Sequence, residues 1–196
     1  MMSVIVKPDL TPSPRDRMIH SAALLFRERG VDATSFADVI DHSGAPRGSI
    51  YHHFPGGKAQ LAEEATQWAG DFTAYALTKA LSADDPVAAV RKFAAFWRGQ
   101  LLDSDCRAGC PVAAAAVAGS DTAGAREAAG AVFTRWSKDV AAALRRQGVP
   151  AKRAASLATT IIAAIEGALI MARAQRSLKP LEQVADELEL LVSGAL

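Results

Sequence analysis

Residues 36–61 read FADVIDHSGAPRGSIYHHFPGGKAQL, and this stretch predicts two short helices separated by a tight turn. Ser35 is expected to cap the first helix, with Asp38 three residues later and Gly44 at its end. After a turn of about three residues, the second helix is expected from Pro46 to Phe54. Two short helices joined this closely after a longer one predict a helix-turn-helix.

The longer helix lies within SPRDRMIHSAALLFRERG, residues 13–30. Ser13 is the expected N-cap, Pro14 occupies the first helical position, Asp16 extends the capping pattern and Gly30 ends the helix. Short helices with so little apolar surface are not stable alone, so the two that follow must pack on this one. The side chains expected at that contact are Phe36, Val39, Ile40, Ile50 and Phe54.

The rest of the chain predicts long helices, and no alternation typical of strands persists anywhere. The expected helices span about 58–81, 86–103, 111–118, 121–147, 151–176 and 181–193, with breaks rich in Gly, Pro, Asp or Ser. The predicted fold is therefore all-α. A flexible arm (1–12) precedes a helix-turn-helix head (13–57), which continues into a C-terminal helical bundle (58–196).

The charge of the chain is balanced and does not by itself point to a polyanion. The formal net charge is +1, and residues 1–60 hold seven Lys and Arg against six Asp and Glu. A nucleic-acid interpretation must therefore depend on where individual charges lie. All four histidines lie within the first 53 residues, which concentrates hydrogen-bonding side chains there.

The chain is expected to be a cytoplasmic protein. Cys106 and Cys110 form no disulfide framework and suit a reducing compartment, and the N-terminus lacks the pattern of a secretory signal. Residues 154–172 carry one charge, Glu166, but their alanines and hydroxyl side chains favour a buried helix over a membrane span. Two cysteines without a nearby histidine do not predict a metal site; a thiol sensor and a loop shaping a pocket entrance are the alternatives.

The second helix of a helix-turn-helix lies in the major groove of DNA. Ile50 and Phe54 are four residues apart and are expected on its buried side, so that the polar side chains face outward. Arg47 suits a bidentate contact to guanine, and the others suit phosphates or base edges. An ordinary solvated polar face is the alternative. The candidate DNA-binding residues are Thr34, Ser35, Arg47, Gly48, Ser49, Tyr51, His52, His53 and Lys58.

This stretch resembles the DNA-binding signature of the TetR family of bacterial transcriptional regulators, in which a G-x-[IL]-Y-x-H-F helix is followed by a lysine. Gly48, Tyr51, His53, Phe54 and Lys58 occupy the matching positions, and the resemblance covers residues 14–62. Pro46 replaces a common capping serine, and PGG inserts one residue before the lysine. GAPRGSIYHHFPGGK together with GCPVAAAA resembles the LmrA/YxaF-like branch.

The resemblance implies a homodimer that binds a roughly palindromic double-stranded DNA operator. It also implies that the last two long helices form the dimer contact. Their apolar stripes could supply that contact or face the core of the same chain. These stripes comprise Leu157, Ile161, Ile165 and Leu169, followed by Leu181, Val184, Leu188 and Leu191.

The resemblance further implies an inducer pocket in the bundle, where most of the aromatic residues lie. They could line a cavity for a small hydrophobic molecule, although aromatic stripes more often serve as core packing. Glu166 could meet a cationic inducer or take part in an interhelical hydrogen bond. The candidate ligand-binding residues are Phe72, Phe93, Trp97, Cys110, Phe133, Trp136, Ile162 and Glu166.

These features predict a ligand-responsive DNA-binding regulator, most simply a repressor that a small molecule releases from its operator. No spacing of Ser, His and Asp or of metal ligands predicts catalysis, so neither an enzyme, a cofactor nor a metal is expected. The alternative is a helical protein that binds small molecules and whose head docks a protein partner. Salt dependence distinguishes the two, because phosphate contacts weaken steeply with salt.

Overall fold

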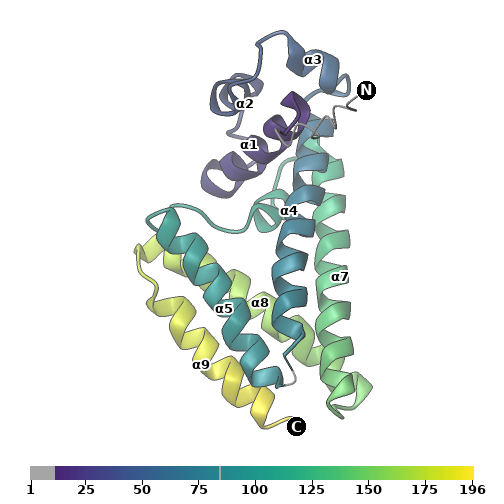
Figure 1. Ribbon diagram of the computed structural model, residues 1–196, viewed down its shortest axis with the longest axis vertical. Helices are drawn as coiled ribbons and strands as arrows, with labels where there is room; N and C mark the ends of the chain where they lie inside the picture. Colours follow the sequence, from purple (N-terminus) through teal and green to yellow (C-terminus); the bar gives the residue numbers. More distant parts are fainter. Residues whose placement is uncertain (1–11, 84) are drawn as a thin grey trace, which may run out of the picture.

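The computed structural model describes residues 12–83 and 85–196, so nearly all of the predicted N-terminal arm lies outside the described residues. The described residues form nine α-helices and one 3-10 helix (Figure 1). They are α1 (Pro14–Arg29), α2 (Phe36–Ser43), α3 (Ser49–His53), α4 (Gly57–Leu81), α5 (Pro86–Asp103), α6 (Pro111–Ala116), η1 (Ser120–Thr122), α7 (Ala123–Arg146), α8 (Ala151–Gln175) and α9 (Lys179–Ser193). The prediction of an all-α fold with a three-helix head is confirmed.

Local capping fixes α1 and α2, as the sequence predicts. The Ser13 hydroxyl accepts a hydrogen bond from the Asp16 amide at 3.1 Å, and Gly30 ends α1. Ser35 and Asp38 form a capping box: the Ser35 hydroxyl accepts from the Asp38 amide at 3.2 Å, and the Asp38 carboxylate accepts from the Ser35 amide at 2.8 Å. Gly44 ends α2 with a φ of 63°, in the left-handed region that glycine adopts without strain.

The start of α3 differs from the prediction. The sequence predicts a helix from Pro46 to Phe54, but the observed helix covers only Ser49–His53. Pro46 and the two residues after it form a turn, which closes where the Ser49 amide donates to the Pro46 carbonyl at 2.9 Å. Gly48 lies in this turn, and its low helix propensity disfavours an earlier start.

The head and the bundle share α4, which runs from one into the other beside α7 (Figure 1). Gly70 permits the close contact between these two helices. A Cβ at this position would lie 2.4 Å from a methyl carbon of Val132. The indole N–H of Trp136, which is fully buried, donates to the Gly70 carbonyl at 3.2 Å. A glycine on α4 therefore sets the spacing of α4 and α7.

The bundle is completed by α5, α8 and α9, with α9 packed against α5 and α8 (Figure 1). Among the described residues, one helix, α8, is long and apolar enough to cross a membrane by length and composition alone. It contacts α7 on one side and α9 on another, and nine of its residues are buried. These contacts account for its apolar character, because its inner faces belong to the core.

The apolar stripes predicted for the dimer contact instead face the core of the chain itself. Leu157, Leu169 and Leu181 are each 1% exposed. The other large side chains of these stripes are buried or half-buried: Ile161, Ile165, Val184, Leu188 and Leu191. Helical periodicity marks a buried face but does not distinguish an internal contact from a contact with a second chain.

Candidate nucleic-acid interface and bundle cavities

The second helix of the helix-turn-helix, α3, is held to the head by its apolar residues. Ile50 is fully buried and Phe54 is 1% exposed, and both belong to the core that includes α1. Tyr51, between them in sequence, is 69% exposed. The edge of its ring contacts Phe36 of α2, with ring centroids 5.6 Å apart. A fixed helix therefore presents an aromatic side chain with a phenol group to solvent.

The polar candidates around Tyr51 divide into exposed and half-buried residues. The side chain of Arg47 is 89% exposed and lies 3.9 Å from the exposed carboxylate of Asp41, an ion pair of small energetic weight. His52 is exposed, whereas His53 is half-buried against it with ring centroids 5.4 Å apart. The exposed backbone of Gly48 lies beside Arg47, and open space surrounds the position of a Cβ there.

The remaining head candidates are partly engaged in the fold. The Ser49 hydroxyl donates to the Pro46 carbonyl at 2.7 Å, and the Ser35 hydroxyl, although exposed, bonds Asp38. Lys58 is half-buried, and its ammonium donates to the Asp32 carbonyl at 2.9 Å. Hydrogen bonds from Ser35 lower the pKa of the Asp38 carboxyl, so the cap is charged at neutral pH.

Thr34 does not lie where the prediction placed it. The prediction offers its hydroxyl to a phosphate, but the residue is 2% exposed and the hydroxyl donates to the Gly30 carbonyl at 2.8 Å. This bond closes the turn between α1 and α2. The threonine therefore serves the fold, and Ser35 is the exposed hydroxyl at this helix end.

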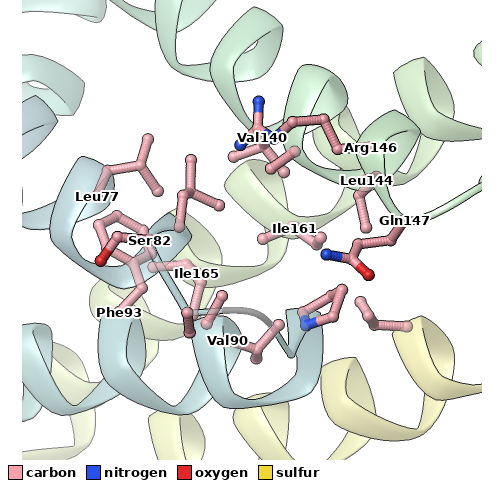
Figure 2. A pocket seen from close by; sticks show the side chains of 16 residues that line it. Leu77, Ser82, Val90, Phe93, Val140, Leu144, Arg146, Gln147, Ile161 and Ile165 are labelled. Atoms are coloured by element: carbon pink, nitrogen blue, oxygen red, sulfur yellow. The ribbon is translucent and has the colours of Figure 1, made fainter.

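The bundle holds an apolar cavity of about 260 Å³ between α4, α5, α7 and α8, called here the bundle cavity (Figure 2). Its wall is mainly aliphatic, and the polar side chains in it belong to Ser82, Arg146 and Gln147. Phe93 is the one predicted ligand-binding residue among its lining. The labelled apolar side chains around it are Leu77, Val90, Phe93, Val140, Leu144, Ile161 and Ile165 (Figure 2).

A second cavity, of about 110 Å³, lies where the head meets the bundle and is called here the junction cavity. Its walls come from α1, α4 and α5, with Pro111 at the start of α6. Phe72 and Trp97, both predicted as ligand-binding residues, line this cavity and not the bundle cavity. The predicted single pocket is therefore two spaces in the described structure.

The other predicted ligand-binding residues line neither cavity. Trp136 is fully buried and bonds Gly70, so it is a core residue, and Ile162 is 7% exposed in the same core. Phe133 packs edge-on against Trp136 with centroids 5.5 Å apart and lines an open surface groove between α7 and α8. Of the five predicted aromatic residues, Phe72, Phe93 and Trp97 therefore line a cavity, whereas Phe133 and Trp136 do not.

Glu166 and Cys110 form a buried pair outside both cavities. Cys110 lies beside the Glu166 carboxyl, whose Oε2 is buried and has no hydrogen-bond partner among the described residues. Burial raises the pKa of Glu166 to about 7, and burial also raises the pKa of the Cys110 thiol. Cys110 directly precedes α6, so the neighbour of this α8 carboxyl is a residue between two helices. Within the described residues, no group of three His, Cys, Asp or Glu is placed to hold a metal.

The sequence reasoning missed the aliphatic residues of the bundle cavity and the polar residues Arg146 and Gln147. Arg146 ends α7, and Gln147 follows it. Each looks like an ordinary helix-end side chain in the sequence. The cavity is lined by residues of helices far apart in the chain, and no local pattern reports such a space. Arg27, which lines the junction cavity, was likewise missed because it falls on the polar side of α1.

Comparison with known proteins agrees with this geometry. Residues 18–65 match the family model described as bacterial regulatory proteins, tetR family, and residues 86–187 match the LmrA/YxaF-like transcriptional regulator C-terminal domain. The HTH-type transcriptional regulator Rv0196 of Mycobacterium tuberculosis is 45% identical over 190 residues, covering 93% of this chain and 96% of the relative. LmrA of Bacillus subtilis, also an HTH-type transcriptional regulator, is 30% identical over 173 residues, covering 87% and 92% of the two chains.

Solved structures support the same fold. A TetR transcriptional regulator from Legionella pneumophila superimposes with a TM-score of 0.82 at 23% identity, covering 93% of this chain and 99% of the other. The regulatory protein TetR from Rhodobacter sphaeroides gives a TM-score of 0.80 at 21% identity, covering 91% and 98%. The matches span the head and the bundle together, and the chain is therefore a member of the TetR family of transcriptional regulators, in its LmrA/YxaF-like branch.

Proposed function

We propose that the protein is a homodimeric cytoplasmic repressor that a small apolar molecule releases from a palindromic operator. The observation that carries the DNA contact is the exposure of Tyr51 on α3 and of Arg47 in the turn before it, on a helix fixed by the buried side chains of Ile50 and Phe54. A surface this exposed and this rigidly supported suits a ligand with fixed geometry. The major groove of DNA is such a ligand.

The proposed roles follow from the chemistry of each side chain. Arg47, at the turn before α3, would contact a guanine edge, and Tyr51 and His52 would reach phosphates or a thymine methyl group. Exposed Gly48 leaves room for the backbone to approach the duplex. Supporting phosphate contacts would come from the half-buried or engaged side chains of Ser35, Ser49, His53 and Lys58.

The dimer contact is proposed on the outer side of α8 and on α9. Ile170 and Met171 of α8 are 63% and 50% exposed, and Leu190 of α9 is 68% exposed. Exposed Ala163 on the same outer side of α8 would permit close approach of a second helix. These residues replace the buried stripes that the sequence suggested. Two heads held by one such contact would read two half-sites.

The bundle cavity is the proposed inducer site because its wall is apolar and its volume approaches the range of small-molecule sites. Phe93 connects it to the head through a series of ring contacts. Its ring stacks on Phe96, Phe96 contacts Phe72, and Phe72 stacks on Trp68. Trp68 in turn contacts His20 of α1 with ring centroids 4.2 Å apart. A ligand that prefers one arrangement of these rings would thereby favour one position of the head.

The test begins with selection of genomic DNA fragments that bind the purified full-length protein. Fluorescence anisotropy on a selected duplex then measures affinity from low to moderate salt. A log–log slope of about −0.9 per phosphate contact supports DNA binding. Arg47→Ala is expected to weaken DNA binding by about tenfold. Arg145→Ala, in the last turn of α7, is the matched control and is expected to leave DNA binding unchanged.

Two results would contradict the proposal. One is a failure to select any duplex at low salt, and the other is an equal loss for Arg47→Ala and Arg145→Ala. Light scattering on the same sample checks the dimer, which Ile170→Glu is expected to dissociate. A head that captured a protein partner with weak salt dependence would favour the alternative of a protein-docking module.

A further inference from the structure

The junction cavity has a wall of aromatic rings. Trp68 and Phe72 of α4 stack with ring centroids 5.6 Å apart, and Phe96 and Trp97 of α5 meet edge to face at 5.1 Å. Phe72 contacts Phe96 across the two helices at 6.0 Å. All four residues line the same space. Aromatic walls on two sides favour a flat ring as the occupant.

Two residues that line this cavity have buried N–H donors with no acceptor among the described residues. The Nε–H of Arg27 and the indole N–H of Trp97 are both buried without a partner. Trp97 is only 3% exposed. Another N–H of Arg27 donates to Gln100, which also lines the cavity. Buried donors left unpaired cost free energy, which an acceptor brought by a ligand would recover.

The charge of the lining favours an anion. Arg27 is the charged side chain in the lining, and no acidic side chain is among the described residues that line the cavity. Burial lowers the pKa of the Arg27 guanidinium, although it stays protonated at neutral pH. A carboxylate is an acceptor without donors and matches the guanidinium in shape, so it fits this set of donors.

Size and access narrow the class of ligand further. A cavity of about 110 Å³ holds a single aromatic ring rather than a fused system. Two exposed apolar side chains, Leu24 at 37% and Phe72 at 47%, belong to its lining, so the cavity opens to solvent. A small molecule can therefore enter without unfolding of the head.

We propose that the junction cavity binds a single-ring aromatic carboxylate, with the ring between the side chains of α4 and α5 and the carboxylate on Arg27 and the indole N–H of Trp97. Such a ligand would touch α1 of the head and α5 of the bundle at once. Close by, the Arg27 carbonyl accepts from the Gly109 amide at 2.9 Å, and the Glu28 carbonyl accepts from Arg173 at 2.8 Å.

An effect of this ligand on DNA would follow from its position between head and bundle. By reciprocity, a ligand that alters operator affinity has its own affinity altered by the operator. That effect rests on the proposed function, but the binding itself does not. The test therefore measures binding without DNA, and operator affinity is measured separately on the same preparation.

Isothermal titration calorimetry of the full-length protein with sodium benzoate is the experiment. One benzoate per chain is expected, with benzamide, the neutral analogue, about tenfold weaker. Trp97→Phe keeps an aromatic ring but removes the unpaired N–H, and it is expected to lower the affinity for benzoate about tenfold. Tyr75→Phe, at an exposed position of α4 outside both cavities, is the control and should leave the affinity for benzoate within about twofold of the wild type.

Arg27→Gln tests the charge, and it too is expected to weaken benzoate by at least about tenfold. Arg27 also bonds Gln100 across the junction, so Arg27→Lys, which keeps the charge, serves as the second variant if Arg27→Gln does not fold. Ala89→Leu, in the bundle cavity, should leave benzoate binding unchanged.

Three results would overturn the inference: no heat of binding in the wild type, equal affinity for benzoate and benzamide, or equal losses of benzoate affinity for Trp97→Phe and Tyr75→Phe. Abolition by Ala89→Leu would instead place benzoate in the bundle cavity and would also overturn it. Failure of any of these tests while the operator still binds would leave the proposed function intact.

Discussion

The rings of Phe93 and Trp97 meet edge to face on α5, with their centroids 6.2 Å apart. Phe93 lines the bundle cavity and Trp97 lines the junction cavity, so the walls of the two spaces are in direct contact. Close-packed side chains transmit a displacement to their neighbours. A ligand that enters or leaves the bundle cavity is therefore expected to shift side chains where the head joins the bundle.

Filling the bundle cavity should remove the response to inducer while sparing DNA binding. Ala89 is 6% exposed and lines this cavity, so Ala89→Leu adds bulk to the space without touching the head. Operator affinity is expected to stay within about twofold of the wild type, because additivity holds for distant sites. For neutral apolar compounds that release the wild-type protein from the operator, the concentration needed for release should rise by at least about tenfold.

Fluorescence anisotropy of the labelled operator, titrated with those compounds, makes the measurement. Ala142→Leu adds the same side chain at an exposed position of α7 and serves as the control. If Ala89→Leu released the operator as readily as Ala142→Leu, the inducer would have to bind elsewhere.

Stability should depend on pH through Glu166. Its pKa is raised by burial from 4.5 to about 7, so the folded protein holds a proton that the unfolded chain has released between these values. Stability is therefore greatest below about pH 4.5 for this group and declines as pH rises through about 7. Glu166→Gln, which stays neutral, should stabilise the protein by up to about 3 kcal/mol at pH 8.5 and change little at pH 4.5.

Urea unfolding of both proteins at the two pH values gives the difference directly. Glu187→Gln, at an exposed position of α9, is the matched control and should show no such dependence. Equal effects of Glu166→Gln at both pH values would show that the carboxyl is not buried in its charged form.

The close contact of α4 and α7 depends on Gly70. Gly70→Ala places a Cβ 2.4 Å from a methyl carbon of Val132, so the helices must separate, at a cost of about 1–3 kcal/mol in unfolding free energy. Gly130→Ala is the control, because nothing lies within 4 Å of its Cβ position on exposed α7 surface. It should stabilise the helix by about 0.5–1 kcal/mol.

In chemical denaturation, the midpoint should thus fall for Gly70→Ala and rise for Gly130→Ala, relative to the wild type. The double variant Gly70→Ala/Val132→Ala removes the clashing methyl groups. Its loss of unfolding free energy is expected to be smaller than the sum of the losses of the two single variants. Additive losses would mean that the contact does not limit the helix spacing.

The parts of the fold set by neighbouring residues could be predicted from the sequence. Ser13, Ser35, Gly30 and Gly44 cap or end helices through contacts within a few residues, and the predicted ends of α1 and α2 match the structure. The beginning of α3 was predicted too early because Pro46 is compatible with both a first helical turn and a preceding turn.

The interior spaces could not be predicted in this way. Trp97 and Trp136 look alike in the sequence, yet one lines the junction cavity and the other fills the core beside Gly70. The difference depends on the spacing of α4, α5 and α7, which arises from contacts between residues far apart in the chain. Similarly, Leu157 follows the helical period that either a core or a dimer contact requires, and only its burial in the folded chain, where it is 1% exposed, assigns it to the core.

The two tyrosines of the chain provide the most direct test of the central claim, that the exposed side of α3 binds duplex DNA. Tyr51 is 69% exposed on α3 and Tyr75 is 63% exposed on α4, so each can be truncated with little effect on the core. The measurement is the dissociation constant of a selected operator for Tyr51→Ala and Tyr75→Ala. Tyr51→Ala is expected to weaken binding by at least about tenfold, with Tyr75→Ala within about twofold of the wild type. Equal affinities of the two variants for the operator would contradict the account.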